Sequence, residues 1–469
     1  GAAVLHHPEN CCGGLNHADF GTMKKGADTI CAIATAAGTG GLGIVRVSGP
    51  DAPRVSRELT GRLPEARFAA LSDFKDNLGR VIDTGIVLYF PAPNSFTGEH
   101  VLELQGHGGS FILQQVLQRV LELGVRMARP GEFSERAFLN DKLDLVQAEA
   151  IADLIESGSD AAARAAQRSL QGVFSSRIHD LQQELTSIRV FVEAAIDFPD
   201  EEIDFLAESD ILERVAEAVA HLNGLLAEAR QGRLLRDGIV LAITGRPNAG
   251  KSSLLNALSG QESAIVTDIP GTTRDVLREQ IDLDGIPVHV ADTAGIRETS
   301  DVIEAEGVRR ARQALASADI VLVVMDSTVS DFRDDSLLSE IPEGVNSIAV
   351  FNKVDLVSAE PGAETDEGVV WLSAKTGQGM DELRSRIREA VGAADQLEGS
   401  FSARQRHVDA LKRTAEHLKG GTEAMVNLQA GELLAEELRL AQQALGEITG
   451  ELLPDDLLGE IFSSFCIGK

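Results

Sequence analysis

The segment "GRPNAGKS", residues 245–252, has the residue types and the spacing that hold a phosphate group. Its two glycines, Gly245 and Gly250, allow backbone N–H groups to approach an anion at the start of a helix. An apolar run precedes the segment and an apolar helical pattern follows it, which are the two contexts that a P-loop requires. Lys251 is then placed to bridge the β- and γ-phosphates of a nucleotide, and the Ser252 hydroxyl to bind Mg²⁺.

Four further motifs follow the P-loop in chain order. They are "TDIPGTTRD" at 267–275, "DTAG" at 292–295, "NKVD" at 352–355 and "SAK" at 373–375. The last three each follow an apolar run, over 288–291, 348–351 and 369–372, that we expect to be a strand. The Asp355 carboxylate can accept hydrogen bonds from the N1–H and the 2-amino group of guanine, which adenine does not offer. The ordered set therefore predicts a GTP site.

The predicted GTP contacts are residues of these five motifs. Thr272 and Thr273 lie on a polar loop that can close over the γ-phosphate, and Asp292 is expected near Mg²⁺. The full set is Gly245, Asn248, Ala249, Gly250, Lys251, Ser252, Ser253, Thr267, Asp268, Ile269, Pro270, Gly271, Thr272, Thr273, Asp292, Thr293, Ala294, Gly295, Asn352, Lys353, Asp355, Ser373, Ala374 and Lys375.

The residue after "DTAG" bears on how the nucleotide could be cleaved. Signalling GTPases have a glutamine there that orients the attacking water, whereas this chain has Ile296, which can neither donate nor accept a side-chain hydrogen bond. A polar group must come from elsewhere, or hydrolysis is very slow. Four acids follow, and each can also be read as a solvated surface acid: Glu298, Asp301, Glu304 and Glu306.

Asn248, inside the P-loop, has two readings. Its amide oxygen is a hard ligand that suits a monovalent cation, and with backbone carbonyls of 267–272 it could seat K⁺ beside the phosphates. Alternatively, the side chain caps the loop. The residue by itself does not separate these readings.

The whole-chain composition limits the class of protein. The 469 residues include 43% hydrophobic and 25% charged side chains, which is typical of a soluble globular protein of several domains. No apolar run is long enough to cross a bilayer. The four cysteines, two of them within 1–22, exclude a disulfide framework and predict a reducing, cytoplasmic location. The net charge of −30 should repel nucleic acid, so any nucleic-acid role needs a local basic patch or a basic partner.

The texture of the sequence changes along the chain. Residues 1–22 read as a leader or cloning remnant, and 23–140 as a mixed α/β domain because short β-branched runs are broken by Gly and Pro. Residues 141–236 and 396–469 have helical spacing, and 237–395 alternate strands and helices as in a parallel sheet with crossover helices. We therefore expect a multidomain α/β plus α protein, in which a discontinuous helical domain holds an inserted P-loop domain.

Two helices carry specific expectations. One long amphipathic helix should include the apolar positions from Leu170 to Ile188. Ser402, with Gln405 three residues later, should cap the helix that follows the insertion.

The chain ends "FCIGK", which places Cys466 close to the carboxyl terminus. As a prenylation box this is poor, because Gly468 is not aliphatic and a terminal lysine is outside the usual range. A cysteine at a chain end can also be incidental. An apolar helical stripe precedes it and should hold Cys466 beside the surface on which the helix packs: Leu457, Leu458, Ile461, Phe462 and Phe465.

The nucleotide motifs over 238–394 resemble the TRAFAC class of GTPases, and the chain from about residue 28 resembles the MnmE (TrmE) family. The matching stretches are "GTGGLGIVRVSGP", "PNSFTGEHVLELQGHGG", "RPGEFSERAFLNDKLDLVQAEAIADLI", "GRPNAGKSSLLNAL", "VTDIPGTTRD", "DTAGIRE" and "FCIGK". The resemblance implies an amino-terminal α/β domain that binds tetrahydrofolate and forms a homodimer, together with an inserted Ras-like GTPase domain.

The resemblance also implies a function. Members work with an FAD-containing partner, MnmG (GidA), to install an aminomethyl-type group, such as carboxymethylaminomethyl, at carbon 5 of the wobble uridine of certain tRNAs. The one-carbon unit comes from a 5-formyl- or 5,10-methylene-tetrahydrofolate, and K⁺ activates the GTPase. If the partner carries most of the tRNA contact, the acidic charge of this chain needs no basic face to offset it.

Site residues follow from the matched positions. The resemblance implies that folate is bound by Arg46, Glu103, Lys142 and Lys469, that K⁺ is bound by Asn248, Thr267, Ile269 and Thr272, and that Mg²⁺ is bound by Ser252 and Thr273. It implies Glu304 as the catalytic acid of hydrolysis and Cys466 as a residue of the modification chemistry. Independently, cations suit the glutamate tail of a folate and a carboxylate suits its pterin N–H donors.

Two other readings compete with this one. A GTP-dependent switch in ribosome assembly would share the P-loop and the hydrophobic residue after "DTAG", but the sequence has no KH-type loop or basic tail. A folate-binding scaffold with a vestigial GTPase is disfavoured by the five intact nucleotide motifs.

Overall fold

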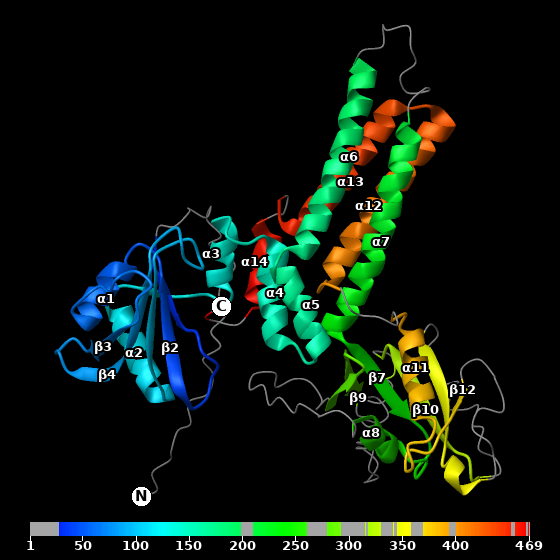
Figure 1. Cartoon of the computed structure of the whole chain (residues 1–469), viewed down its shortest axis with the longest axis horizontal. Helices are drawn as coiled ribbons and strands as arrows, with labels where there is room; N and C mark the ends of the chain where they lie inside the picture. The colour runs from blue at the N-terminus through cyan, green and yellow to red at the C-terminus, as the bar shows by residue number, and fades with distance from the viewer. Residues whose placement is uncertain are drawn as a thin grey trace, which may run out of the picture. The chain divides into compact units, whose positions relative to one another are not determined.

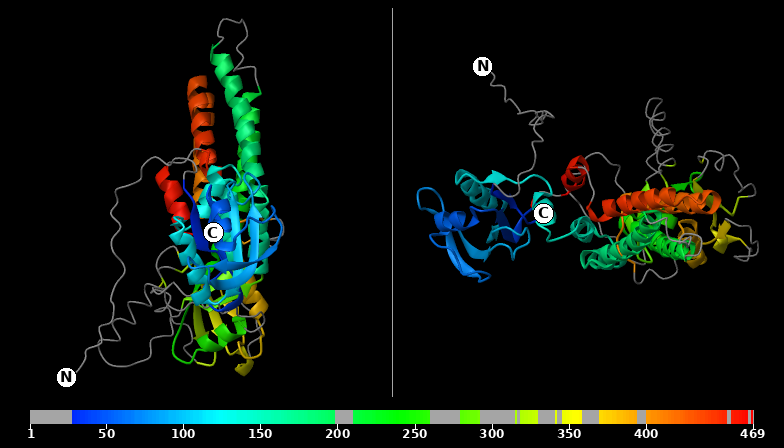
Figure 2. Two further views of the ribbon diagram at one scale, coloured as in Figure 1. Left: turned by 90° about the vertical axis from the view of Figure 1, so that its left-hand side faces the viewer. Right: turned by 90° about the horizontal axis from the view of Figure 1, so that it is seen from above.

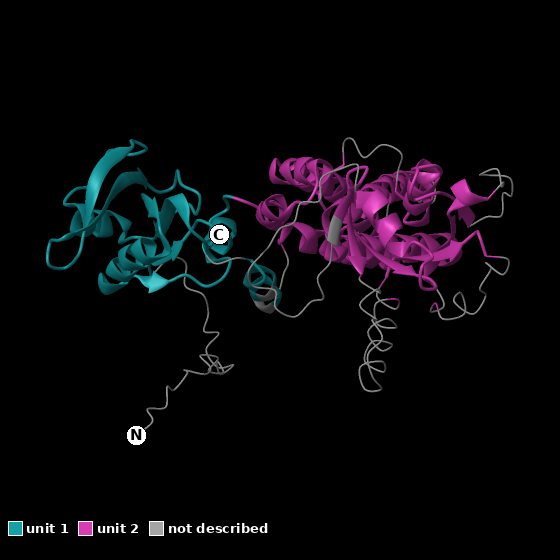
Figure 3. Cartoon of the chain, turned by 90° about the horizontal axis from the view of Figure 1, so that it is seen from below, with its two compact units in different colours: residues 1–142, 456–469 teal, residues 143–455 magenta. Residues whose placement is uncertain are grey.

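The structure is a computed structural model of the chain, and it describes residues 28–197, 210–259, 279–291, 315, 318–329, 341, 345–357, 369–393, 400–451, 455–465 and 468. The chain forms two compact units, which are coloured separately in Figure 3. Unit 1 consists of residues 1–142 and 456–469, and unit 2 of residues 143–455. The end of the chain therefore belongs to unit 1, whereas the sequence grouped all of 396–469 with the helical domain.

Unit 1 is built around a six-stranded sheet with the strand order β3-β4-β5-β2-β1-β6 (Figure 1). All neighbouring strands are antiparallel except β1 and β6. Helices α1 (Ala52–Thr60) and α2 (Ser110–Glu122) bury apolar side chains in the same core as the sheet. The pairing of β2 with β5 sets Arg46 directly opposite Glu103. The strands are β1 (Ile30–Ile33), β2 (Gly40–Ser48), β3 (Ala70–Lys75), β4 (Val81–Phe90), β5 (Val101–Gly108) and β6 (Arg126–Met127).

The C-terminal helix α14 (Asp455–Ser463) packs on α3 (Glu132–Leu139) within unit 1. The ring centroids of Phe138 and Phe462 lie 6.2 Å apart. A Cβ at Gly131, which has φ +67°, would lie 2.3 Å from the Phe462 carbonyl oxygen, so only glycine allows this close approach. Leu457, expected in the apolar stripe, is 36% exposed. The residues that the stripe does bury are Ile461, Phe462 and Phe465.

The helical part of unit 2 is made by segments on both sides of an α/β segment. Figures 1 and 2 show long helices from both segments running side by side. Their buried side chains, such as Leu185, Leu222, Leu418 and Leu438, share one core, which confirms the expected discontinuous helical domain. Among the described residues, no helix is long and apolar enough to cross a membrane. The helices are α4 (Leu145–Glu156), α5 (Asp160–Leu170), α6 (Val173–Asp197), α7 (Ile211–Asp237), α12 (Gln405–Leu428) and α13 (Gly431–Thr449).

One expected helix is in fact two. The apolar positions from Leu170 to Ile188 are divided between α5 and α6, because α5 ends at Leu170. Gly172, with φ +84°, lies between the two helices. A left-handed glycine ends a helix because its backbone conformation cannot continue the right-handed turn.

The expected cap of α12 is also wrong. The Ser402 hydroxyl donates to Asp153 Oδ2 at 2.6 Å instead of capping the helix. The helix begins after Arg404, whose backbone N–H donates to His407 Nδ1 at 3.0 Å.

Glu149 of α4 is a buried carboxylate that joins α4 to α12. Arg406 donates to both of its oxygens, at 2.8 and 2.7 Å, and His407 Nε2 lies 3.0 Å from Oε2. Burial alone would raise the pKa of Glu149, but the Arg406 guanidinium and His407 hold it well below its usual range. Burial lowers the pKa of His407 to about 4, so this ring is neutral near pH 7. Removing the Arg406 side chain would take away both guanidinium hydrogen bonds to this buried carboxylate, at a cost of about 3–5 kcal/mol.

The α/β segment of unit 2 is a six-stranded sheet with the order β12-β11-β10-β7-β9-β8. All neighbouring strands are parallel except β8 and β9. The strands expected from the apolar runs before the nucleotide motifs are confirmed, and the carboxyl ends of parallel strands meet at one edge of a sheet. The elements are β7 (Ile239–Thr244), α8 (Lys251–Ser259), β8 (Glu279–Leu283), β9 (Ile286–Ala291), β10 (Ile320–Asp326), β11 (Asn346–Asn352), β12 (Val369–Trp371) and α11 (Met380–Ala390).

Candidate functional site

The P-loop connects β7 to α8 at the edge where the parallel strands end. Gly245 has φ +149°, and a Cβ there would lie 2.2 Å from the Val324 carbonyl oxygen. Gly250 has φ +96°, and a Cβ there would lie 2.2 Å from Asn352 Nδ2. Both glycines of the motif are therefore required by the backbone angle and by the space available.

The "NKVD" motif holds the P-loop from the end of β11. Asn352 Nδ2 donates to the Ala249 carbonyl oxygen at 3.0 Å, and Lys353 Nζ donates to the Asn248 carbonyl oxygen at 2.8 Å. Asn352 Oδ1 accepts from the backbone N–H of Ala374 at 3.0 Å. One buried asparagine side chain thus joins the P-loop to the "SAK" motif.

Asp355 is oriented by the "SAK" motif. The Ser373 hydroxyl donates to Asp355 Oδ1 at 2.6 Å. Ser373 is buried, whereas Asp355 is exposed. A buried hydroxyl therefore fixes one oxygen of an exposed carboxylate, which is the group predicted to bind guanine.

Lys251 and the two serines after it begin α8. Lys251 Nζ donates to the carbonyl oxygens of Gly245, at 2.7 Å, and of Arg246, at 3.0 Å, so the ammonium lies across the loop. Burial lowers the pKa of this lysine. Ser252 and Ser253 are exposed at the helix N-terminus. A helix N-terminus with an ammonium group beside it suits a bound phosphate, and an exposed hydroxyl there suits Mg²⁺.

Asp326 contacts the predicted nucleotide motifs, and the sequence motifs did not include it. Its Oδ2 accepts from Lys353 Nζ at 2.5 Å, and the neighbouring Ser327 hydroxyl donates to the Asn352 carbonyl oxygen at 2.7 Å. Burial raises the pKa of Asp326, but the hydrogen bond from Lys353 holds it below its usual value. The available signal was its place at the end of the apolar run of β10, at the same sheet edge as the motifs.

A second cluster lies in unit 1 around Arg46. Its Nε and Nη2 donate to Glu103 Oε1 at 3.1 and 3.0 Å, and its Nη1 donates to the Gly468 carbonyl oxygen at 3.5 Å. The guanidinium lies 5.8 Å from the ring centroids of Phe96 and Phe133. The Arg46 and Glu103 side chains are 23% and 15% exposed. The structure therefore brings Gly468, from the end of the chain, to this half-buried ion pair.

Two further features border this cluster. Gly468 has φ +98°, and a Cβ there would lie 2.3 Å from the Ile33 carbonyl oxygen, so the tail backbone touches β1 directly. Lys142 is exposed and packs on Gly98, where a Cβ would lie 3.3 Å from Lys142 Cγ. Gly98 lies two residues from Phe96, the ring that contacts the Arg46 guanidinium.

Comparison with known proteins covers nearly the whole chain. The family profile described as "MnmE helical domain" matches residues 145–466, and that described as "GTP-binding protein TrmE N-terminus" matches residues 29–142. The "tRNA modification GTPase MnmE" of Pseudomonas syringae pv. tomato is 56% identical over 456 residues, which are 95% of this chain and 100% of that protein. This chain belongs to the MnmE family. The resemblance carried by the sequence motifs is thereby confirmed.

Solved structures that resemble this MnmE-family chain include two GTP-binding proteins. The G domain of the T. maritima FeoB iron transporter is 28% identical, covers 32% of this chain and 98% of its own, and has a TM-score of 0.26. Era from Aquifex aeolicus is 23% identical, covers 45% of this chain and 89% of its own, and also has a TM-score of 0.26. The family assignment rests on the two profiles and on the Pseudomonas relative.

Several residues predicted for the MnmE-type sites lie outside the described residues, and their roles stay predictions. Within the described part of the chain, no group of three or more His, Cys, Asp or Glu side chains is arranged to hold a metal ion. The residues outside it are Thr267, Asp268, Ile269, Pro270, Gly271, Thr272, Thr273, Asp292, Thr293, Ala294, Gly295, Glu304, Cys466 and Lys469.

Proposed function

We propose that this protein hydrolyses GTP in the modification of tRNA, at carbon 5 of the wobble uridine of certain tRNAs. Membership of the MnmE family supports this proposal. The observation that carries the nucleotide part is the Asn352 side chain, which bonds to both the P-loop and the "SAK" backbone. A GTP site needs its phosphate-binding loop and its base-reading motifs held together, and the two hydrogen bonds of Asn352 support that arrangement.

Within the GTP site, each residue has a proposed role. Asp355 selects guanine, and Lys251 balances the charge of the β- and γ-phosphates. Ser252 and Thr273 hold Mg²⁺, which neutralises phosphate charge when bound. Glu304 orients the attacking water in place of the glutamine that signalling GTPases use.

The proposed K⁺ ligands are Asn248, Thr267, Ile269 and Thr272. Of these the structure describes Asn248, which is exposed and has φ +65°. Lys353 Nζ donates one hydrogen bond to the Asn248 carbonyl oxygen. We expect the side-chain amide oxygen of Asn248, a hard oxygen donor, to be the ligand that this residue offers to K⁺.

The second proposed ligand is a tetrahydrofolate derivative, in unit 1. We propose that Arg46, Glu103, Lys142 and Lys469 bind it, with the cations facing its glutamate tail and Glu103 facing the pterin N–H groups. The support is that Arg46 and Glu103 form a half-buried pair that also contacts the tail at Gly468. Gly468 lies two residues after Cys466 in the sequence, so we propose that the one-carbon carrier binds near this end of the chain.

We further propose that the protein acts as a cytoplasmic homodimer with the FAD-containing partner MnmG (GidA). The net charge of −30 supports a division of labour in which the partner carries most of the tRNA contact. A basic surface on the partner would then bind the acidic surface of this chain.

The proposed function is tested by the nucleosides of bulk tRNA. A strain that lacks this protein is expected to lose its carbon-5 derivatives of wobble uridine, because their formation requires the GTP-dependent step. Complementation with the wild-type chain should restore them. Intact wobble-uridine derivatives combined with a ribosome-assembly defect would instead favour the assembly-switch reading.

GTP hydrolysis is expected to be at least about tenfold faster in K⁺ than in Na⁺ at equal ionic strength, because a cation beside the phosphates takes the place of an arginine finger. Na⁺ is too small for a site built on an amide and loop carbonyls. Asn248→Ala should remove the difference, and the measurement is the steady-state rate of phosphate release. Equal wild-type rates in both salts would refute the K⁺ site.

A further inference from the structure

Asp153, on α4, holds both places where the chain passes between the helical part of unit 2 and its α/β segment. At the first crossing, α7 leads into β7, and Arg236 Nε donates to Asp153 Oδ1 at 2.9 Å. At the second, the chain returns to α12, and Ser402 Oγ donates to Asp153 Oδ2 at 2.6 Å while Arg404 Nη2 donates to Oδ1 at 2.7 Å. The Asp153 side chain is 6% exposed. One buried carboxylate therefore accepts hydrogen bonds from residues at both crossings.

Each crossing is also constrained by its own neighbours. The Ser402 backbone N–H donates to the Ala165 carbonyl oxygen at 3.1 Å, and the Ser169 hydroxyl donates to the Ser402 carbonyl oxygen at 2.9 Å. At Gly238, with φ +66°, a Cβ would lie 2.3 Å from the Pro287 carbonyl oxygen. Motion of the α/β segment against the helices must therefore act on this junction.

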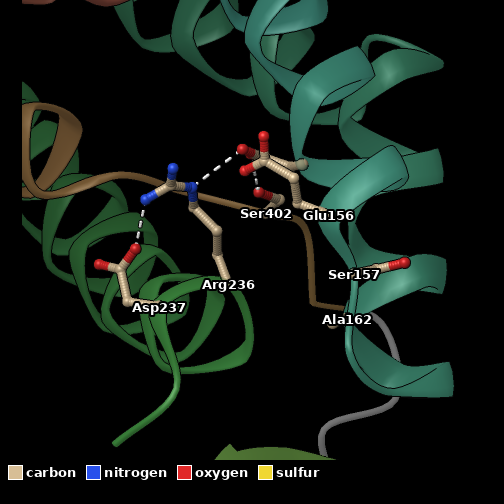
Figure 4. Close-up of a pocket in the computed structure, with 7 residues that line it drawn as sticks. Glu156, Ser157, Ala162, Arg236, Asp237 and Ser402 are labelled. Atoms are coloured by element: carbon tan, nitrogen blue, oxygen red, sulfur yellow. Dashed lines mark hydrogen bonds and ion pairs between the residues drawn. The ribbon is translucent and has the colours of Figure 1, made fainter. Parts of the chain in front are cut away.

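A cavity of about 210 Å³ adjoins the junction, and Figure 4 shows the side chains that line it. It is bordered by the end of α4, the start of α5, the end of α7 and Ser402. Arg236 Nη1 also pairs with Asp237 Oδ1. The Arg236 guanidinium thus has a second carboxylate and open space beside it, and it can leave Asp153 without becoming an unpaired charge.

We propose that Asp153 is a positioning residue that couples GTP hydrolysis to the tRNA reaction by holding, and in one part of the cycle releasing, Arg236. This rests on the proposed function. The strand β7 runs directly from the crossing to the P-loop, so a shift at the nucleotide reaches Arg236 through one rigid element. The two-state element is the Arg236 guanidinium, shared between Asp153 and Asp237. The helical core then carries the change onward.

Asp153→Asn tests the proposal, because it removes the charge and keeps the size of the side chain. GTP hydrolysis is expected to stay within about twofold of wild type, whereas the GTP consumed per tRNA modified should rise about tenfold, within the range usual for coupling between sites. The matched control is Glu228→Gln, which breaks the ion pair (2.7 Å) between Glu228 of α7, the helix that carries Arg236, and Arg177 of α6, away from the crossings. This control should leave the ratio unchanged.

Two further variants keep the test informative if Asp153→Asn folds poorly. Arg236→Gln removes the ion pair with Asp153 at the first crossing, and Ser402→Ala removes the hydrogen bond to Asp153 at the second. Each variant should raise the GTP consumed per tRNA modified. Hydrogen–deuterium exchange at 400–404 should differ in the wild type between GDP and a non-hydrolysable GTP analogue, and the folded variants should lose that difference. The proposal is overturned if folded variants consume the same amount of GTP per tRNA modified as the wild type. It is also overturned if hydrogen–deuterium exchange at 400–404 in the wild type is the same with GDP and with the GTP analogue. If the wild type modifies no tRNA, the proposed function fails, and the exchange measurement still decides the role of Asp153.

Discussion

Asp355→Asn is expected to lower GTP affinity at least about 100-fold and to shift preference towards xanthine nucleotides. The carboxylate would accept two hydrogen bonds from guanine, and hydrogen bonds to a charged group contribute about 1.5–3 kcal/mol each. The Ser373 hydroxyl, 2.6 Å from Oδ1, can still donate to the amide oxygen of the variant. The amide N–H₂ group then faces the base, where it repels the N1–H of guanine and suits the 2-oxo group of xanthine. Binding of fluorescent guanine and xanthine nucleotides measures both effects.

Ser373→Ala is the matched control for this substitution. It removes the hydrogen bond that orients Asp355 but keeps the carboxylate, so GTP should bind about tenfold or less more weakly with no gain for xanthine. Circular dichroism should show both variants folded. Unchanged GTP affinity in Asp355→Asn would remove Asp355 from the site.

Cys466→Ser is expected to abolish tRNA modification while folding and GTP hydrolysis stay close to wild type. The GTP site lies in unit 2, whereas the tail belongs to unit 1, so the nucleotide site should not sense the change. Oxygen in place of sulfur is a small change in volume, but a hydroxyl lacks the nucleophilicity of a thiolate. Modified nucleosides in a complemented deletion strain, together with the GTPase rate of the purified variant, give the two readouts.

The buried Cys31 provides the control. Burial raises the pKa of its thiol to about 12, so it stays protonated and packs as a small apolar side chain. Cys31→Ala should therefore keep tRNA modification, with at most a modest loss of stability.

Deletion of 466–469 should weaken folate binding as well, because Lys469 is lost. Wild-type modification by Cys466→Ser would make the terminal cysteine incidental.

The nucleotide motifs could be predicted because each of them is local. A short stretch of sequence is enough to recognise a glycine with positive φ, a lysine at the start of a helix or an acid after a buried strand. Gly245 and Gly250 are required by the backbone that surrounds them, and β7 and β11 lie where the apolar runs predicted strands. The helical spacing of apolar residues also predicted the split helical domain. It did not predict the break at Gly172, which divides one expected helix into two.

The association of the tail was not predictable by the same means. An apolar stripe shows that α14 must be buried but not against which surface. The choice of unit 1 depends on Gly131, which admits the Phe462 carbonyl oxygen, and on the ring of Phe138. These residues precede the helix by more than half of the chain.

By itself, the sequence determined the nucleotide class, the layered fold and the family, since these depend on short-range patterns of glycine, charge and apolar spacing. Only the tertiary structure decided which side chains join those parts. Asn352 bonds to Ala249 across 103 positions, and Ser402 bonds to Asp153 across 249. The reason is physical: a hydrogen bond needs two groups within about 3 Å, and for residues so far apart in the chain that distance is set by the packing of everything between them.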